Sequence, residues 1–438
     1  MNREVREQDQ HTGLAGLVLA SLFIGACAGL LGATFRLTLH WVDGLRGAAI
    51  AAAQDIPVAG YLLVAGGAAA AAGLAAWLVH RFARDAAGSG IPQVEVIIAT
   101  GELPRTPLRL ILVKFFGGTL AIGSGLALGR EGPSVQMGAS IAHVLGRLFR
   151  RNAPDIRVLV AAGAGAGLAT AFNAPIAGAV FVLEELVRRF EPRIAVAALG
   201  ASAMAIAAAR MLLGHEPDFH VPAQPYPGFG TIPVHLALGL LAGAAGALYC
   251  RLVLGLLRAG DRLAGLHPAL RAALIGALVG TLAWFLPHLV GGGDLLTQRT
   301  LDAVDPLGTI CLVFALRFVL GPLSYMAPTP GGLFAPMLVL GAQIGVAFAL
   351  VLGPIFPSAP APAAMGIVAM AAFFTAVVRA PLTGIVLVTE LTGSFTLLLP
   401  MLAACFAAMA VPALVGVRPL YDALRDRLLE REARSPAP

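Results

Sequence analysis

The sequence predicts an all-helical protein that crosses a membrane many times and consists of two related halves. Hydrophobic residues make up 58% of the 438 residues, and the mean hydropathy is +0.83. Both values are typical of a polytopic membrane protein and exclude an ordinary soluble domain. Apolar stretches recur from Gly13 to Leu414, and several, such as Leu108–Leu128 and Val234–Leu257, are long enough for a span of ~20 residues. Two blocks of sequence recur about 200 residues apart, which predicts the two halves.

The chain begins with a polar, charged segment, residues 1–12, followed by the apolar stretch Gly13–Val42. This stretch is too long for the hydrophobic core of a signal peptide, so no cleavable signal is expected. The four cysteines are scattered, mostly in apolar segments, which predicts free thiols rather than disulfides. The nine histidines lack metal-binding spacing, and we find no nucleophile with a neighbouring base. The sequence therefore predicts no enzymatic activity, no metal and no cofactor.

The formal net charge is +6. In a membrane protein this balance indicates basic cytoplasmic loops rather than a partner nucleic acid. The basic residues gather in two loops and the C-terminal tail: Arg147, Arg150, Arg151 and Arg157; Arg188, Arg189 and Arg193; and Arg425, Arg427, Arg431 and Arg434. We expect these loops and both termini in the cytoplasm. The excess of arginine over lysine and the short tails favour a bacterial inner membrane.

Three segments rich in glycine and proline precede or open apolar helices: residues 88–92 (GSGIP), 129–133 (GREGP) and 331–336 (GGLFAP). Proline is favoured at the first helical position, and glycine lets the backbone approach an ion closely. The free N–H groups at a helix start carry about half a positive charge and need an acceptor inside a membrane. The three segments therefore predict an anion site without a lysine or arginine clamp. Partial charges also hold an ion weakly enough to release it.

The second segment places Arg130 and Glu131 between two glycines, ahead of Pro133. An ionisable group at bilayer depth costs roughly 2.5–3.5 kcal/mol, so it usually has a function. We expect Pro133 to open a helix whose start holds either an anion or the Glu131 carboxylate, in competition. Adjacent helical residues do not face each other, so Arg130 is expected to bond backbone carbonyls and orient the turn.

An internal repeat supports the two halves. The residues from Pro133 read PSVQMGASI, and those from Pro336 read PMLVLGAQI. A second block, APxxGxVxVxE, occurs with its proline at Pro175 and again at Pro381. The two pairs of prolines are 203 and 206 residues apart, which predicts duplication of a whole half-chain.

Repeats in transporters commonly have inverted topology, with the site near the midplane between broken helices. The helix starts at Pro133 and Pro336 should then converge on one anion. The polar stretch between the halves is rich in proline and aromatic residues. The predicted organisation is a cytoplasmic segment (1–12), repeat one (13–213), a joint (214–231), repeat two (232–421), and a cytoplasmic tail (422–438).

The repeat also separates the glutamates by role. Glu184 and Glu390 are equivalent, which favours a common structural role. Glu185 is equivalent to Leu391, so the repeated architecture does not require an acidic group at this position. Glu185 is therefore a candidate functional residue. Glu95 is expected to be a buried partner of a basic residue.

Lys114 is the only lysine in the chain and lies in an apolar run. It either contributes positive potential to an anion path or extends its ammonium group to the membrane surface.

The three glycine–proline segments resemble the anion-site motifs of the CLC family of chloride channels and chloride/proton antiporters. The run Phe172–Glu185 (FNAPIAGAVFVLEE) resembles the segment of that family that carries a proton-pathway glutamate. Tyr421, in Arg418–Tyr421 (RPLY), matches the tyrosine near the end of its membrane domain. The resemblance stays in register over nearly the whole chain.

The resemblance implies a CLC-type homodimer with one anion pathway per subunit, each subunit built from two inverted halves of tilted, broken helices. The hydroxyls of Ser89 and Tyr421 and the backbone N–H groups of Leu333 and Phe334 would bind the central anion. Serine at position 89 accompanies chloride preference in the family. The supporting residues would be Gly88, Gly90, Pro92, Gly129, Arg130, Gly132, Pro133, Gly332 and Pro336.

The resemblance further implies that Glu131 is the outer gate and that Glu185 passes protons to and from the cytoplasmic side. Only 17 residues follow Tyr421, so the paired regulatory domains of larger members are not expected. The partners would be chloride, protons, membrane lipids and a second copy of the chain.

Two functions remain open on this scaffold. One is secondary active exchange of chloride for protons, and the other is a passive chloride channel gated by voltage or pH. The presence of both Glu131 and Glu185 favours exchange.

Overall fold

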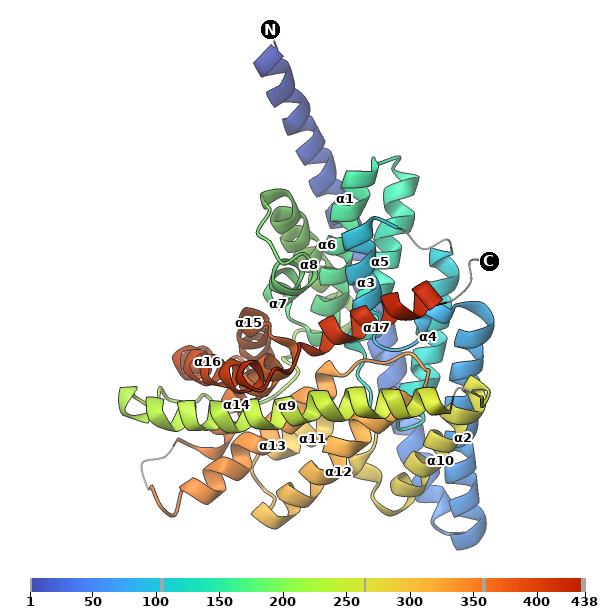
Figure 1. The fold of residues 1–438 in the computed structure, drawn as a ribbon, viewed down its shortest axis with the longest axis vertical. Helices are drawn as coiled ribbons and strands as arrows, with labels where there is room; N and C mark the ends of the chain where they lie inside the picture. The colour runs from blue at the N-terminus through green and yellow to red at the C-terminus, as the bar shows by residue number, and fades with distance from the viewer. Residues whose placement is uncertain (1, 103–105, 264, 357–359, 435–438) are drawn as a thin grey trace.

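The computed structural model describes residues 2–102, 106–263, 265–356 and 360–434 (Figure 1). Over these residues the protein is helical, with seventeen α-helices, five short helical turns and only two isolated backbone bridges. Nine of the described helices are long and apolar enough to cross a membrane. These features confirm the predicted all-helical, polytopic membrane fold.

The first half of the chain contains eight α-helices. Their bounds are α1 (Asn2–Ala53), α2 (Pro57–Phe82), α3 (Ile91–Thr100), α4 (Pro107–Gly123), α5 (Glu131–Leu148), α6 (Ala153–Phe172), α7 (Pro175–Phe181) and α8 (Pro192–Leu213). A short 3-10 turn, η1 (Arg84–Ala86), precedes α3, and a π-helical turn, η2 (Val182–Leu186), continues α7.

The second half contains nine α-helices. Their bounds are α9 (Ile232–Arg262), α10 (Pro268–Phe285), α11 (Asp294–Leu301), α12 (Leu307–Met326), α13 (Phe334–Leu352), α14 (Pro362–Val378), α15 (Pro381–Thr392), α16 (Leu398–Leu414) and α17 (Leu420–Arg434). The remaining short turns are η3 (Phe229–Thr231), η4 (Pro287–Leu289) and η5 (Phe395–Leu397).

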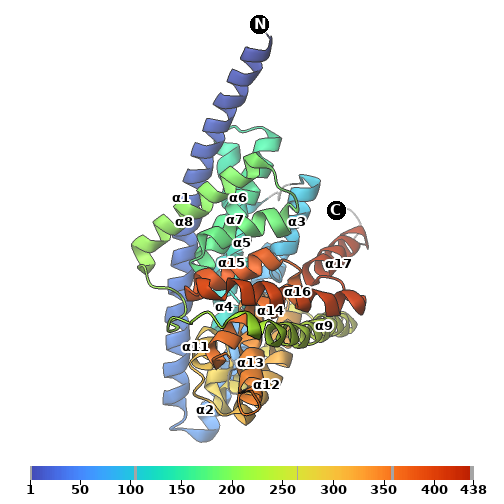
Figure 2. The same cartoon turned by 90° about the vertical axis from the view of Figure 1, so that its left-hand side faces the viewer.

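The packing of the helices repeats between the halves. In the first half α1 packs on α8 and α5 on α6, and in the second half α9 packs on α16 and α13 on α14. Contacts between α2 and α10 and between α7 and α15 join the two halves. Figures 1 and 2 show α5 to α8 gathered toward the end from which α1 projects, and α11 to α13 toward the other.

Two buried cations confirm that the halves are equivalent. Lys114 of α4 donates to carbonyls 28 and 26 residues earlier in the chain, and Arg317 of α12 does the same with carbonyls at the same two separations. Lys114 and Arg317 are 203 residues apart, the separation already found between Pro133 and Pro336. Each cation fixes the loop that precedes a short helix, α3 in one half and α11 in the other.

Glu184 and Glu390 perform the same task in the two halves, as predicted from their equivalence. Glu184 of the first half lies at the start of α15, and Glu390 of the second half lies at the start of α7. Glu390 accepts hydrogen bonds from the amides of Ile176 (3.0 Å) and Ala177 (2.7 Å), and Glu184 accepts from those of Leu382 (3.0 Å) and Thr383 (2.6 Å). The otherwise free N–H groups of two short helices are thereby satisfied inside the protein.

The helices at the predicted site begin earlier than the sequence indicates. Pro133 and Pro336 were expected at the first helical position, but α5 begins at Glu131 and α13 at Phe334. The expectation was two residues late, because the missing N–H of proline is harmless anywhere in the first turn. Glu131 therefore lies inside the first turn of α5 rather than before it.

Candidate functional site

The three glycine–proline segments are joined by backbone hydrogen bonds near the centre of the molecule. Gly129 and Gly332 exchange two bonds, each of 2.8 Å. Gly88 donates to the carbonyl of Thr329 (2.9 Å) and accepts from the amide of Gly331 (3.1 Å). Segments separated by more than 200 residues in the chain thus form one cluster, as the repeat predicted.

The Glu131 carboxylate lies at the start of the equivalent helix of the other half. Its side chain is fully buried, and Oε1 accepts a hydrogen bond of 2.7 Å from the backbone N–H of Phe334. Its Oε2 is buried and has no hydrogen-bond partner among the described residues. Two equivalent helix starts, those of α5 and α13, therefore meet at one carboxylate, as an inverted repeat requires.

Glycine is required around this carboxylate because no side chain would fit. A Cβ added to Gly332 would lie 2.3 Å from Glu131 Oε1, and one added to Gly129 would lie 2.0 Å from Oε2. A Cβ on Gly132 would lie 2.5 Å from Ser89 Oγ. The glycines of the motifs thus bring the carboxylate and the Ser89 hydroxyl into direct contact with backbone.

The hydroxyls of Ser89 and Tyr421 are buried hydrogen-bond donors without an acceptor in the part of the chain that the structure describes. Both side chains are at most 1% exposed, and they lie next to each other. The Tyr421 ring packs against Phe334, with ring centroids 5.6 Å apart. Two convergent donors beside a helix start fit a bound anion, because a buried donor with nothing to accept its proton is costly.

Aromatic rings surround the start of α13. Phe334 is fully buried and contacts the rings of Phe172, Phe181 and Phe374, at centroid distances of 6.3, 5.9 and 4.7 Å. These contacts fix the backbone that presents the Phe334 amide. Leu333 is also fully buried and occupies the N-cap position of α13, while anion binding by its amide stays a prediction.

Lys114 does not reach the membrane surface. Its side chain is fully buried, and Nζ donates to the carbonyls of Ala86 (3.0 Å) and Gly88 (2.9 Å). The second alternative for this residue is therefore wrong. The Lys114 side-chain nitrogen thereby holds the loop Gly88–Gly90, which carries the Ser89 hydroxyl.

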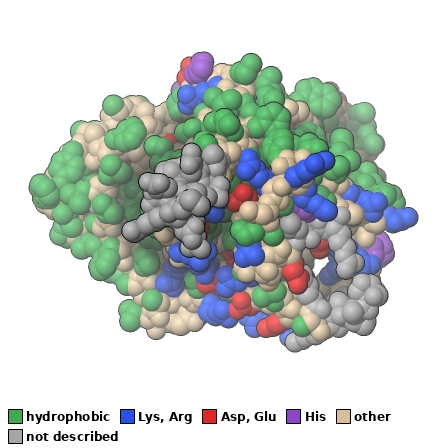
Figure 3. Space-filling model, turned by 90° about the horizontal axis from the view of Figure 1, so that it is seen from above, with side chains coloured by type: hydrophobic (Ala, Val, Ile, Leu, Met, Phe, Trp, Pro, Cys, Tyr) green, Lys and Arg blue, Asp and Glu red, His purple; other side chains and the backbone are tan. Residues whose placement is uncertain are grey.

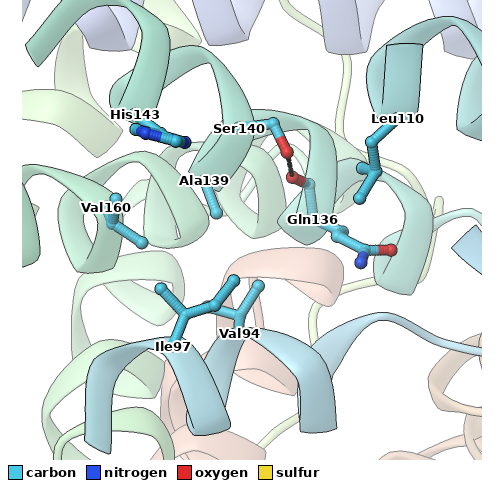
Figure 4. A pocket seen from close by; sticks show the side chains of 8 residues that line it. All are labelled: Val94, Ile97, Leu110, Gln136, Ala139, Ser140, His143 and Val160. Carbon is cyan, nitrogen blue, oxygen red and sulfur yellow. Dashed lines mark hydrogen bonds between the residues drawn. The ribbon is translucent and has the colours of Figure 1, made fainter. Parts of the chain in front are cut away.

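The helices α3 and α5 pack side by side around a small, mostly apolar pocket of about 10 Å³ (Figure 4). Val94 and Ile97 of α3 line it from one side, and the side chain of Gln136 in α5 lines it from the other. Gln136 Nε2 also donates to the carbonyl of Asp85 (3.0 Å), just before the loop Gly88–Gly90. The helix that carries Glu131 is thus tied to the loop that carries Ser89.

Glu185 lies in a separate cluster of charges. It belongs to the π-helical turn η2 and is 3% exposed, so it is not a solvated loop charge. Arg188 Nη2 lies 3.6 Å from Glu185 Oε1 and 2.5 Å from an oxygen of Asp422. Arg425 pairs with Glu95 (3.4 Å), which confirms that Glu95 is a buried partner of a basic residue.

The sequence analysis did not identify Asp422 and Arg425 as members of this cluster. Both are on α17, which begins one residue before Tyr421, so the start of one helix carries the buried Tyr421 hydroxyl and, directly after it, members of the charged cluster. The position of Asp422 directly after Tyr421 was the available signal. A cavity of about 560 Å³ is lined by Glu184, Glu185, Arg188 and Asp422.

A second cavity lies around Arg130. The Arg130 Nε donates to the carbonyl of Ala171 (2.9 Å), which confirms the predicted carbonyl bond. Its other two nitrogens pair with Asp218 (3.1 Å) and Asp294 (2.7 Å), neither of which the sequence indicated. Arg130 and Asp294 line a cavity of about 570 Å³ that reaches Gly129, in the segment that carries Glu131.

Arginine side chains gather at the end of the molecule where α1 begins. Figure 3 shows blue basic side chains with a few acidic ones on this end, and hydrophobic side chains filling the left of the view. Arg151 from this end donates to the carbonyl of Gly16 (2.7 Å) and Arg193 pairs with Asp155 (2.8 Å). Within the described residues no group of three or more histidine, cysteine or acidic side chains could hold a metal ion.

Comparisons with known proteins agree with this arrangement. Residues 67–413 match the sequence model of a family described as "Voltage gated chloride channel". The chain is 37% identical to the H(+)/Cl(-) exchange transporter ClcA of Vibrio cholerae serotype O1, covering 95% of this chain and 90% of that protein. The ClcA protein of Cronobacter sakazakii is also 37% identical, with coverages of 98% and 93%.

Solved structures show the same fold. A slow cyanobacterial Cl-/H+ antiporter superposes with a TM-score of 0.91 at 35% sequence identity, covering 95% of this chain and 99% of that one. A eukaryotic CLC transporter superposes with a TM-score of 0.78 at 24% identity, covering 93% and 73%. The match to the family model over most of the chain and the identity to full-length relatives show that the chain belongs to the CLC family.

Proposed function

We propose that this protein exchanges chloride for protons across the membrane. The observation that carries the proposal is the hydrogen bond from the Phe334 amide to the Glu131 carboxylate. A negatively charged oxygen lies at the start of α13, where a helix start would otherwise attract a free anion. The names of the relatives, which are exchange transporters, favour exchange over a passive channel.

Competition between Glu131 and chloride gives the coupling. When Glu131 is ionised, its carboxylate accepts from the Phe334 amide and excludes a second negative charge. When the carboxylate binds a proton, it loses its charge and is a weaker acceptor. Chloride then takes its place at the helix starts, beside the hydroxyls of Ser89 and Tyr421. Each turnover thus links the binding of a proton to the movement of an anion.

A proton on Glu131 also needs a route to the other side, and we assign Glu185 to it. Glu185 is buried beside the inner cavity, within a cluster that contains Arg188 and Asp422. The positive charge of Arg188 holds the Glu185 carboxyl group in place. The cavity lets water from the cytoplasm reach this carboxyl group. Tyr421 and Asp422 are adjacent on α17, so a movement of this helix would shift the anion site and the inner cluster together.

We further propose that the protein forms a homodimer in a bacterial inner membrane, with both termini in the cytoplasm. The bacterial relatives and the arginine-rich end at the start of α1 support this orientation. The repeats would span residues 13–213 and 232–421, joined by 214–231. The helix α17 crosses from the second repeat into the residues that follow it without a break.

The test is a flux assay on the protein in proteoliposomes with crossed chloride and proton gradients. A chloride gradient should drive protons uphill in the wild type. Glu131→Gln and Glu131→Ala should abolish proton movement and leave chloride flux. Coupled exchange in either variant would contradict the mechanism. A reversal potential that follows chloride alone in the wild type would instead show a passive channel.

A further inference from the structure

We propose that Asp218 and Asp294 are positioning residues that hold Arg130 and cancel its charge beside the gate. This inference rests on the proposed function, because it concerns the conditions under which Glu131 opens. The two aspartates come from distant parts of the chain. Asp218 lies in the stretch between the two halves, and Asp294 is the first residue of α11.

Each of the three nitrogens of the Arg130 guanidinium has a hydrogen-bond partner. The guanidinium donates to one carbonyl and to two carboxylates, those of Asp218 and Asp294. The Asp218 carboxylate also pairs with a second guanidinium, that of Arg36, at 2.8 Å. Both arginines also bond the last carbonyls of α6, since Arg36 donates to Thr170 and Arg130 to Ala171. A side chain with this many bonds has one orientation.

Asp294 is itself held firmly. Arg317 is 2% exposed and donates to the carbonyls of Gly291 (2.8 Å) and Gly292 (3.1 Å), in the loop that leads into α11. The amide of Gly291 donates to the carbonyl of Gly125 (2.7 Å), close to the gate segment. This loop is the counterpart of the one that Lys114 holds in the first half. The buried Arg317 therefore fixes where the Asp294 carboxylate meets Arg130.

The charges near the gate balance in the described structure. Arg36 and Arg130 carry two positive charges, and Asp218 and Asp294 carry two negative charges. Across the outer cavity Asp43 pairs with Arg46 (2.5 Å), another balanced pair. Three buried tyrosines, Tyr249, Tyr325 and Tyr421, also lie near Glu131, and their hydroxyls are neutral at ordinary pH. The other titratable groups that line the cavity are His40, His288 and Arg299, and Arg299 is paired with Asp305.

Removing one carboxylate leaves one positive charge uncompensated next to Glu131. A nearby positive charge favours the ionised form of an acid, so Glu131 would bind its proton only at lower pH. Because the gate opens on protonation, exchange would need more acid. The Asp294 carboxylate is half exposed, so the effect should shrink as ionic strength rises.

The experiment measures exchange against pH in proteoliposomes that contain Asp294→Asn, at constant chloride and low ionic strength. The pH of half-maximal exchange should fall by roughly half a unit to one unit. Added impermeant salt should reduce this shift. Arg130→Gln should move the midpoint the other way, to higher pH, and adding Asp294→Asn to that variant should lower it again, because the carboxylate left without its partner is then removed.

Asp261→Asn is the matched control. Asp261 is 46% exposed, about as much as Asp294, and pairs with Arg427 and Arg431 of α17. None of these three residues lines the cavity around Arg130. The control should leave the midpoint unchanged.

Several outcomes would overturn the inference. A rate that falls equally at every pH, with the same midpoint, would show that Asp294 has a structural role only. An equal shift in Asp261→Asn would show a general effect of surface charge. Asp218→Asn should repeat the shift, and Asp294, which is more exposed, keeps the test valid if that variant does not fold. If the wild type does not exchange protons at all, the proposed function fails instead.

Discussion

At the scale of single residues, the site depends on the space that glycine leaves. The Glu131 carboxylate can reach the Phe334 amide only because Gly129 and Gly332 have no side chains. The two glycines also exchange backbone hydrogen bonds, so the space and the position of the carboxylate are set by the same residues. The motif glycines therefore set the position of the Glu131 carboxylate directly, in addition to shaping the turn of the chain.

Gly332→Ala should loosen the coupling between chloride and protons. Its Cβ would lie 2.3 Å from Glu131 Oε1, so the carboxylate would leave the Phe334 amide. We expect the number of protons moved per chloride to fall at least twofold, and chloride flux to become less dependent on pH. Parallel measurement of proton and chloride flux checks this. Gly44→Ala in α1, where a Cβ meets no atom within 4 Å, is the control and should leave the ratio unchanged. A normal ratio in Gly332→Ala would refute this account of the glycine.

At the scale of helices, the two halves exchange their caps. The start of α7 is capped by Glu390 near the end of α15, and the start of α15 is capped by Glu184 in η2, the turn that continues α7. Each cap needs the other half to be in place. The two repeats are thus joined by hydrogen bonds to charged groups, which are stronger than bonds between neutral groups.

Glu390→Ala should destabilise the protein without changing the coupling of chloride to protons. The variant leaves the amides of Ile176 and Ala177 without their acceptor, a loss of about 1–2 kcal/mol. Thermal unfolding of the purified protein in detergent should occur at lower temperature, while the flux ratio stays at the wild-type value. Glu216→Ala, which removes a glutamate that is 83% exposed, should not change the unfolding temperature. Unchanged stability in Glu390→Ala would mean that the cap has no energetic weight.

Much of the site could be predicted because it lies in local motifs. The segments around Ser89, Glu131 and Phe334 each show their glycines and prolines in one short stretch, and the duplication is visible in the spacing of the prolines. The partners of Arg130 and Arg188 could not be predicted in this way. Asp218, Asp294 and Asp422 are single acidic residues without a motif, and only the folded chain brings them to their arginines.

Helix boundaries show a second limit. The free N–H groups of a first turn tolerate proline at several positions, so Pro133 marks the beginning of α5 only to within a turn. The position of the Lys114 side chain is also not determined by local sequence. From the sequence alone its ammonium group could reach either the membrane surface or a carbonyl, and the choice depends on the loop Gly88–Gly90, which lies 26 residues away.

At the scale of the whole molecule, the proposed anion site lies between the two halves, so an anion bound there would link them. Ser89 and Glu131 belong to the first half, and Phe334 and Tyr421 to the second. An anion bound by all of these groups exists only in the folded protein. A ligand of this kind stabilises the folded state by an amount that grows with its concentration, about 2.7 kcal/mol at one hundred times the dissociation constant.

Chloride should therefore raise the unfolding temperature, and it should do so more at low pH than at neutral pH. At neutral pH the ionised Glu131 carboxylate competes with chloride for the Phe334 amide, whereas at pH 4.5 its protonation removes the competitor. Thermal unfolding in detergent, with chloride replaced by gluconate at equal ionic strength as the control, measures the difference. In Glu131→Gln the side chain carries no charge, so the chloride effect should be large and equal at both pH values. If chloride stabilised the wild type equally at both pH values, chloride and the carboxylate could not be sharing one position, because a shared position makes each weaken the binding of the other.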